Sequence, residues 1–174
     1  MTQSPIIILP DAGPLITLAY ARALDLLLKP GWSVSIVDMV LEEVTRNKTP
    51  TSGQIGQWVE QHKLTILPTR TYRIYQDNLA KNPVDHRKAN LGELSIQEVM
   101  NDLALSEPDT VGVFLFEDHK IARASFLLPD NCRKISTRAW LQFLEGRGFI
   151  PSAMDIERAA IHNGRLFSQI RFPL

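Results

Sequence analysis

The chain has 174 residues, and its 19 basic and 19 acidic side chains leave no net charge at neutral pH. This length fits one domain, and a composition that is 44% hydrophobic and 22% charged excludes extended disorder, collagen-like repeats and coiled-coil rods. No apolar run approaches the ~20 residues of a membrane helix, and the N-terminus lacks a secretory signal pattern. The one cysteine, Cys132, cannot form an internal disulfide. We therefore expect a protein of the reducing cytoplasm.

Short apolar segments alternate with amphipathic ones along the chain, which predicts an α/β fold with a parallel sheet covered by helices. The expected strands are residues 6–9, 33–37, 64–67, 111–116 and 133–135. The expected helices are residues 14–28, 39–45, 51–59, 72–79, 91–103, 118–127, 137–144 and 152–163. The polar stretch 81–90 contains a proline and is expected to be an exposed loop.

Particular residues mark where several of these helices begin. Pro14 suits the first position of a helix, where its missing N–H is not needed. Asp38, Thr51 and Ser152 are expected to cap the helices that follow them, with Thr51 forming a capping box with Gln54.

Acidic residues recur where ligands bind in open parallel sheets, just beyond the carboxyl ends of the strands. Asp11 directly follows the first strand, and Asp118, preceded by Glu117, follows the strongly apolar fourth strand. Glu43 and Glu93 lie early on two of the expected helices. Because crossovers between parallel strands are right-handed, we expect these carboxylates to reach one edge of the sheet.

Four clustered carboxylates require compensation, because like charges raise one another's pKa and unpaired buried anions are costly. A divalent cation supplies it, and an oxygen-only ligand set favours Mg²⁺ or Mn²⁺ over Zn²⁺. Such an ion suits phosphodiester hydrolysis, since it activates water and neutralises phosphate charge. With four acids assigned to metal, the remainder of the chain would carry a charge of about +4, which permits RNA as a substrate.

Four short motifs, in order, resemble the PIN domain, a family that includes the VapC-like toxin nucleases. They read ILPDAGPLI at residues 8–16, VLEEV at 40–44, LGEL at 91–94, and LFED at 115–118 followed by Ala122-Arg123. The resemblance covers about residues 6–144, most of the chain. It implies a three-layer α/β/α sandwich around a parallel sheet of four to five strands.

The same resemblance implies cleavage of RNA by water with Mg²⁺ or Mn²⁺, leaving 5′-phosphate and 3′-hydroxyl ends. By motif position, Asp11, Glu43, Glu93 and Asp118 match the acidic metal site of the family. Residues 1–148 would form the PIN-like nuclease domain, and residues 149–174 a C-terminal helical extension packed on it or serving a partner.

Several of these acids also have a plainer structural interpretation. Asp11 and Asp118 could cap the helices that follow them, and Glu93 could complement the positive N-terminus of its helix. Glu42 adjoins Glu43 and could replace it; we prefer Glu43 because it directly precedes an apolar residue, as in the family pattern.

Other residues near the expected site have candidate roles. Glu117 is an additional candidate metal ligand. Lys120, Arg123 and Thr137 are expected to contact the substrate, although Arg123 could instead orient a carboxylate and Thr137 could cap its helix.

The function that the sequence favours is a metal-dependent endoribonuclease, acting as the toxin of a toxin–antitoxin pair. RNA would be its substrate, an antitoxin protein its partner and a homodimer its assembly, with no membrane involved. One alternative is a non-catalytic PIN-like module that binds a protein. Another is a receiver-like phospho-signalling domain, which an acid placed like Glu43 on an early helix does not fit.

Overall fold

The computed structural model describes residues 4–83, 91–117 and 127–166, and within them the chain forms a five-stranded parallel sheet in the order β3-β2-β1-β4-β5. The strands are β1 (Ile6–Pro10), β2 (Ser33–Val37), β3 (Thr65–Leu67), β4 (Val111–Phe116) and β5 (Cys132–Ser136). The helices are α1 (Ala12–Tyr20), the 3₁₀ helix η1 (Leu24–Leu27), α2 (Asp38–Thr45), α3 (Ser52–Gln61), α4 (Arg70–Lys81), α5 (Leu91–Ser106), α7 (Thr137–Gly146) and α8 (Ala153–His162).

β1 is the central strand of the sheet, and β4 is one of its two neighbours. Ile8 and Leu9 of β1 and Phe114 of β4 are buried, as expected for parallel strands covered on both faces. The two strands pair along the whole of β1, in a register that ends with Pro10 opposite Leu115. The α/β class predicted from the alternating apolar segments is confirmed.

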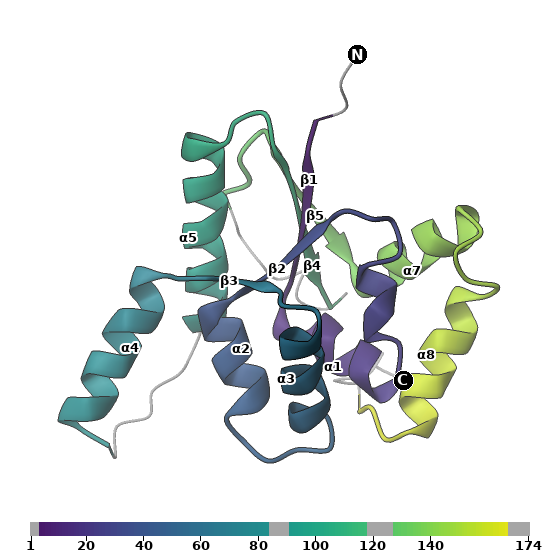
Figure 1. Ribbon diagram of the computed structural model, residues 1–174, viewed down its shortest axis with the longest axis horizontal. Coiled ribbons are helices and arrows are strands. Elements are labelled where there is room, and N and C mark those ends of the chain that lie inside the picture. Colours follow the sequence, from purple (N-terminus) through teal and green to yellow (C-terminus); the bar gives the residue numbers. More distant parts are fainter. Residues whose placement is uncertain (1–3, 84–90, 118–126, 167–174) are drawn as a thin grey trace, which may run out of the picture.

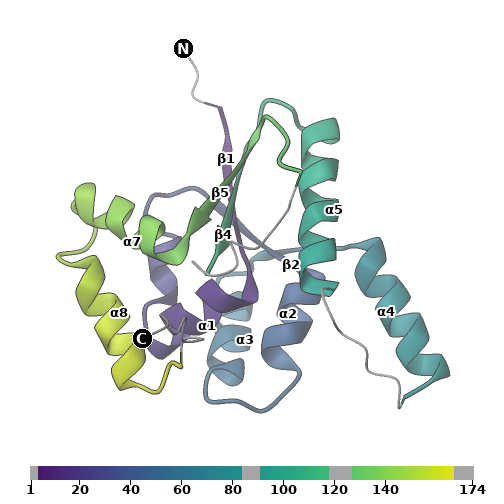
Figure 2. The same cartoon turned by 180° about the vertical axis from the view of Figure 1, so that it is seen from behind.

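Helices flank the sheet on both sides. Figure 1 shows α5 on one side and α7 and α8 on the other, and Figure 2 shows the same arrangement from behind. α5 approaches β4 closely at Gly112, where a Cβ would lie 2.5 Å from the Leu103 side chain. The predicted three-layer α/β/α sandwich is therefore confirmed.

The direction in which strands are added to the sheet reverses between β1 and β4. β2 and β3 follow on one side of β1, whereas β4 and β5 lie on its other side. In open parallel sheets, ligands bind at such a switch point, outside the carboxyl ends of the two strands. The topology thus singles out the residues that follow Pro10 and Phe116.

The first helix differs from its predicted extent of residues 14–28. It begins two residues earlier, at Ala12, and ends at Tyr20 because Arg22 adopts a left-handed φ of 54°. The N–H of Ala23 then donates to the carbonyl of Leu18, the hydrogen bond that closes a Schellman-type helix end. The remaining apolar residues continue as η1.

Of the three predicted caps, Ser152 is confirmed, Thr51 is confirmed in position only, and Asp38 is wrong. Asp38 is the first residue of α2 rather than its cap, and Thr51 occupies the cap position of α3 without a side-chain hydrogen bond to that helix. Ser152 caps α8 by accepting a hydrogen bond from the N–H of Asp155 at 3.2 Å. The predicted helix from Asp118 lies outside the described residues, apart from its last position.

Asp38 instead links α2 to α4. Its Oδ2 accepts a hydrogen bond from the N–H of Thr69 at 2.7 Å, and its Oδ1 accepts one from the Thr69 hydroxyl at 2.8 Å. Thr69 in turn caps α4 by accepting from the N–H of Tyr72 at 3.1 Å. One carboxylate therefore orients the capping residue of a helix that lies distant in sequence.

Glu98 of α5 binds the next two N–H groups at the start of α4. Its carboxylate accepts hydrogen bonds from the N–H of Arg70 at 2.7 Å, the N–H of Thr71 at 3.1 Å and the Thr71 hydroxyl at 2.9 Å. Burial alone would raise the pKa of Glu98, but these hydrogen bonds and the nearby Arg70 guanidinium lower the pKa below its ordinary value of 4.5. All four N–H groups at the start of α4 are thus bonded to oxygen.

None of the helices within the described ranges is both long enough and apolar enough to cross a bilayer.

The Glu98 contact predicts a pH-dependent stability. Because the pKa of Glu98 is lowered by folding, its contribution is present above the unfolded value near 4.5 and is lost as the pH falls through the folded value. We expect Glu98→Gln to lower the free energy of unfolding by about 1–2 kcal/mol at pH 7 and by much less at a pH below the lowered pKa of folded Glu98. Urea unfolding at both pH values measures this, with the exposed Glu60→Gln as control; an equal loss at both values contradicts it.

Candidate functional site

Asp11 lies at the centre of the carboxyl edge of the sheet. It directly follows β1, its side chain is fully buried, and its N–H donates to the carbonyl of Leu115 in β4 at 2.9 Å. Although Asp11 occupies the cap position of α1, its side chain makes no capping hydrogen bond to that helix. Helix capping therefore does not explain this carboxylate.

Glu117 occupies the matching place after β4 and is also buried, at 4% exposure. Its Oε1 accepts hydrogen bonds from the hydroxyl of Thr17 at 2.8 Å and from that of Thr137 at 3.3 Å. The guanidinium of Arg165, which follows α8, lies 3.9 Å from the same oxygen. Protein groups thus bind one of the two carboxylate oxygens of this candidate metal ligand.

The side chain of Glu117 lies against the first turn of α1. A Cβ added to Gly13 would come within 2.4 Å of Glu117 Cγ, so this position leaves room for hydrogen alone. The glycine of the segment PDAG therefore permits close packing of the helix start against a buried carboxylate.

Glu43 and Glu42 point toward different helices. Oε2 of Glu43 lies 2.9 Å from the position of a Cβ on Gly92, at the start of α5. Glu42 accepts a hydrogen bond from the hydroxyl of Tyr72 in α4 at 3.4 Å. Burial and the negative charge of Glu42 raise the pKa of Tyr72. Of the two adjacent acids, Glu43 is therefore the one directed to the helix that carries Glu93.

Glu93 is half-buried in the first turn of α5, next to Gly92. The contact of Glu43 with Gly92 brings the acid of α2 to this same helix start. A carboxylate here also complements the positive end of the α5 dipole, so the structural interpretation of Glu93 stays open.

Three acids of the predicted four-carboxylate cluster, Asp11, Glu43 and Glu93, lie within the described residues, and they do not form a metal-holding group by themselves. Across residues 4–83, 91–117 and 127–166, no three His, Cys, Asp or Glu side chains lie close enough to hold a metal ion. Asp118, Lys120 and Arg123 lie outside these ranges. The cluster and the two basic substrate contacts therefore stay predictions.

Thr137 has a different neighbourhood from the one expected. It is buried in the first turn of α7, and its hydroxyl lies 3.3 Å from both Glu117 Oε1 and the carbonyl oxygen of Phe116, which share its one hydrogen. The capping role considered for it belongs to Ser136, which accepts from the N–H of Ala139 at 3.0 Å. The structure places Thr137 with Glu117, and its contact with substrate stays a prediction.

Buried carboxylates surround the start of α1 and change what this helix end can bind. In doubly wound folds with a related strand order, the N-terminus of the first helix binds a phosphate directly. Here a phosphate would meet the negative charges of Asp11 and Glu117. A divalent cation removes this repulsion, and oxygen-only donors match Mg²⁺ or Mn²⁺. The donor chemistry at this edge therefore fits such an ion.

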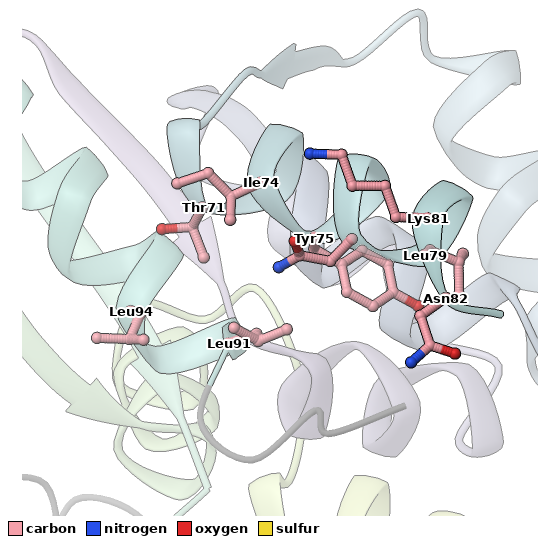
Figure 3. A pocket seen from close by; sticks show the side chains of 9 residues that line it. Thr71, Ile74, Tyr75, Leu79, Lys81, Asn82, Leu91 and Leu94 are labelled. Atoms are coloured by element: carbon pink, nitrogen blue, oxygen red, sulfur yellow. The ribbon is translucent and has the colours of Figure 1, made fainter. Parts of the chain in front are cut away.

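A groove of about 530 Å³ lies between α4 and α5 (Figure 3). Ile74 and Leu79 of α4 face Leu91 and Leu94 of α5 across it, and Ile74 and Leu94 are more than half exposed. The described residues that line it include no carboxylate and no imidazole. The groove therefore combines an apolar floor of isoleucine and leucine with polar side chains such as Lys81 and Asn82.

Two residues of the site, Thr17 and Arg165, are not among those predicted from the sequence. Thr17 is a buried polar residue among the apolar residues of α1, so its position on the buried face was a usable signal. Arg165 follows the end of the last helix, and nothing in the local pattern indicates that it returns to the sheet edge.

Comparisons with models of known protein families, with curated proteins and with solved structures give no match.

The close packing at Gly13 predicts a specific stability defect. We expect Gly13→Ala to lower the free energy of unfolding by about 1–3 kcal/mol, because its methyl group displaces a Glu117 side chain held by two threonines. Gly53 occupies the same helical position at the start of α3 with nothing within 4 Å, so Gly53→Ala should be neutral or slightly stabilising. Equal melting temperatures of the two variants would contradict the packing argument.

Proposed function

We propose that this protein is a metal-dependent endoribonuclease of the PIN type. The observation that carries the proposal is the fully buried carboxylate of Asp11, which follows β1 at the switch point of the sheet. Glu117, which follows the neighbouring strand β4, is already paired with Arg165. Ligands of parallel sheets bind at this place, and carboxylate oxygens are the ligands that Mg²⁺ and Mn²⁺ prefer. A phosphodiester substrate that approaches through a divalent cation suits both features.

In this proposal Asp11, Glu43, Glu93 and Asp118 hold Mg²⁺ or Mn²⁺. Such an ion supplies neutralisation of phosphate charge and a more acidic water. The chain's own contribution is positional: Asp11 is fixed by the β1–β4 pairing, and Glu43 is directed to the start of α5 beside Glu93.

The proposed substrate and partners follow the sequence resemblance. RNA would lie across the carboxyl edge, with Lys120 and Arg123 as its contacts, whereas the buried hydroxyl of Thr137 is engaged with Glu117. An antitoxin protein, a homodimeric assembly and a cytoplasmic location belong to the same proposal. The strand order supports it over the receiver alternative, because β2-β1 is followed here by β4, whereas receiver-like folds place the third strand there.

A second candidate is a non-catalytic module that binds a protein, and the apolar α4–α5 groove favours it. Such a module gains nothing from buried acids at the sheet edge. Calorimetric titration with Mn²⁺ separates the two candidates, because heat of binding supports the nuclease and its absence supports the module.

The proposed function predicts that RNA cleavage depends on both metal and Asp11. With labelled RNA and Mn²⁺, we expect cleavage that EDTA abolishes and that Asp11→Asn slows at least about 100-fold, equivalent to about 2.7 kcal/mol of transition-state stabilisation. The reason is that the substitution removes a charged metal ligand and leaves the shape of the side chain nearly unchanged.

The matched control is Asp109→Asn. Asp109 is exposed and precedes β4, at the opposite edge of the sheet, so its substitution should leave cleavage unchanged. Circular dichroism melting confirms that both variants fold. Cleavage that survives EDTA, or that Asp11→Asn leaves at the wild-type rate, contradicts the proposal.

A further inference from the structure

The segment after α8 returns to the carboxyl edge of the sheet. α8 packs against α1, and the Asn163 side chain donates to the carbonyl of Tyr20 at 2.7 Å. Gly164 adopts a left-handed φ of 105°, and the N–H of Arg165 then donates to the carbonyl of Ala160 at 2.9 Å. The backbone of Arg165 is thus fixed by the end of α8.

The Arg165 side chain reaches the buried carboxylate after β4. Its Nε donates to the hydroxyl of Thr17 at 2.9 Å, and Nη2 lies 3.9 Å from Oε1 of Glu117. Thr17 donates to that same oxygen, so one hydroxyl links the guanidinium and the carboxylate. The two charged side chains are only 16% and 6% exposed.

Because the ion pair is buried, breaking it should affect the stability of the fold. An exposed pair contributes little to stability, whereas removing one partner of a buried pair leaves an uncompensated charge at high cost. A positive charge here also weakens the binding of any cation at the same edge, because Asp11 follows the neighbouring strand and like charges repel.

We propose that Arg165 is a positioning residue of the sheet edge, which acts as a built-in counter-cation for Glu117. It holds this carboxylate between Thr17 and Thr137 as an anchor of the C-terminal extension and withholds it from the metal. The extension is then part of the site. The anchoring stands on the contacts alone, whereas the effect on metal rests on the proposed function.

Unfolding in EDTA tests the anchoring without metal. We expect Arg165→Met to lower the equilibrium constant for folding at least about fivefold more in the wild type than in a Glu117→Gln background, because the pair is coupled. Arg165→Lys keeps the charge and should cost less than Arg165→Met. Arg158→Met, on the exposed side of α8, is the matched control and should show no coupling to Glu117. Additive costs of Arg165→Met and Glu117→Gln overturn the proposal.

Mn²⁺ titration tests the effect on metal. We expect Arg165→Met to tighten Mn²⁺ binding at least about threefold, because it removes a positive charge and frees a carboxylate nearby. Glu117→Gln should weaken binding by less than about threefold, and a loss of about tenfold or more would identify Glu117 as a ligand and overturn the proposal. If Arg165→Met binds Mn²⁺ as tightly as the wild type or more weakly, Arg165 has a structural role only, and the proposal is also overturned.

The two experiments separate the failure of this inference from that of the proposed function. If the wild type binds no Mn²⁺, the proposed function fails and the effect of Arg165 on metal fails with it. The unfolding cycle in EDTA still decides whether Arg165 anchors Glu117.

Discussion

The parallel pairing of β1 with β4 is the constraint on which the rest of the structure depends. Because the register ends with Pro10 opposite Leu115, Asp11 and Glu117 leave the sheet from neighbouring strands at the same edge. The N–H of Asp11 extends the ladder by one more hydrogen bond to Leu115, so the acid cannot move from this edge without breaking the pairing. Two buried negative charges are thereby fixed at the place where parallel sheets bind their ligands.

The protein stabilises the buried carboxylate of Glu117 with groups from distant parts of the chain. Thr17 from α1, Thr137 from α7 and Arg165 from the C-terminal extension all meet at Glu117. A polar network of this kind specifies one arrangement of its elements, since each buried group needs its particular partners. It ties the end of α8 to α1 through Arg165 and Thr17, while the proposed function uses the chemistry of Asp11.

Much of the fold follows from local sequence, whereas the site does so only in part. The doubly apolar segments that became β1 and β4 predict buried parallel strands, and Ser152 predicts its helix, because these signals act over a few residues. The end of α1 was mispredicted because its apolar pattern continues through η1, and only the left-handed backbone of Arg22 interrupts it. Asp11 was found from its place after a strand. The link between Arg165 and Glu117 was not, because it depends on how α8 packs and no short-range pattern encodes that.

Diffraction from crystals grown with Mn²⁺, with anomalous scattering used to locate the ion, tests the central claim most directly. The account predicts an anomalous peak at the carboxyl edge between β1 and β4, within about 2.0–2.4 Å of an Asp11 carboxylate oxygen, with Glu117 still bound to Thr17 and Arg165. Mn²⁺ bound elsewhere, or an Asp11 carboxylate that only protein groups contact at saturating Mn²⁺, would contradict it.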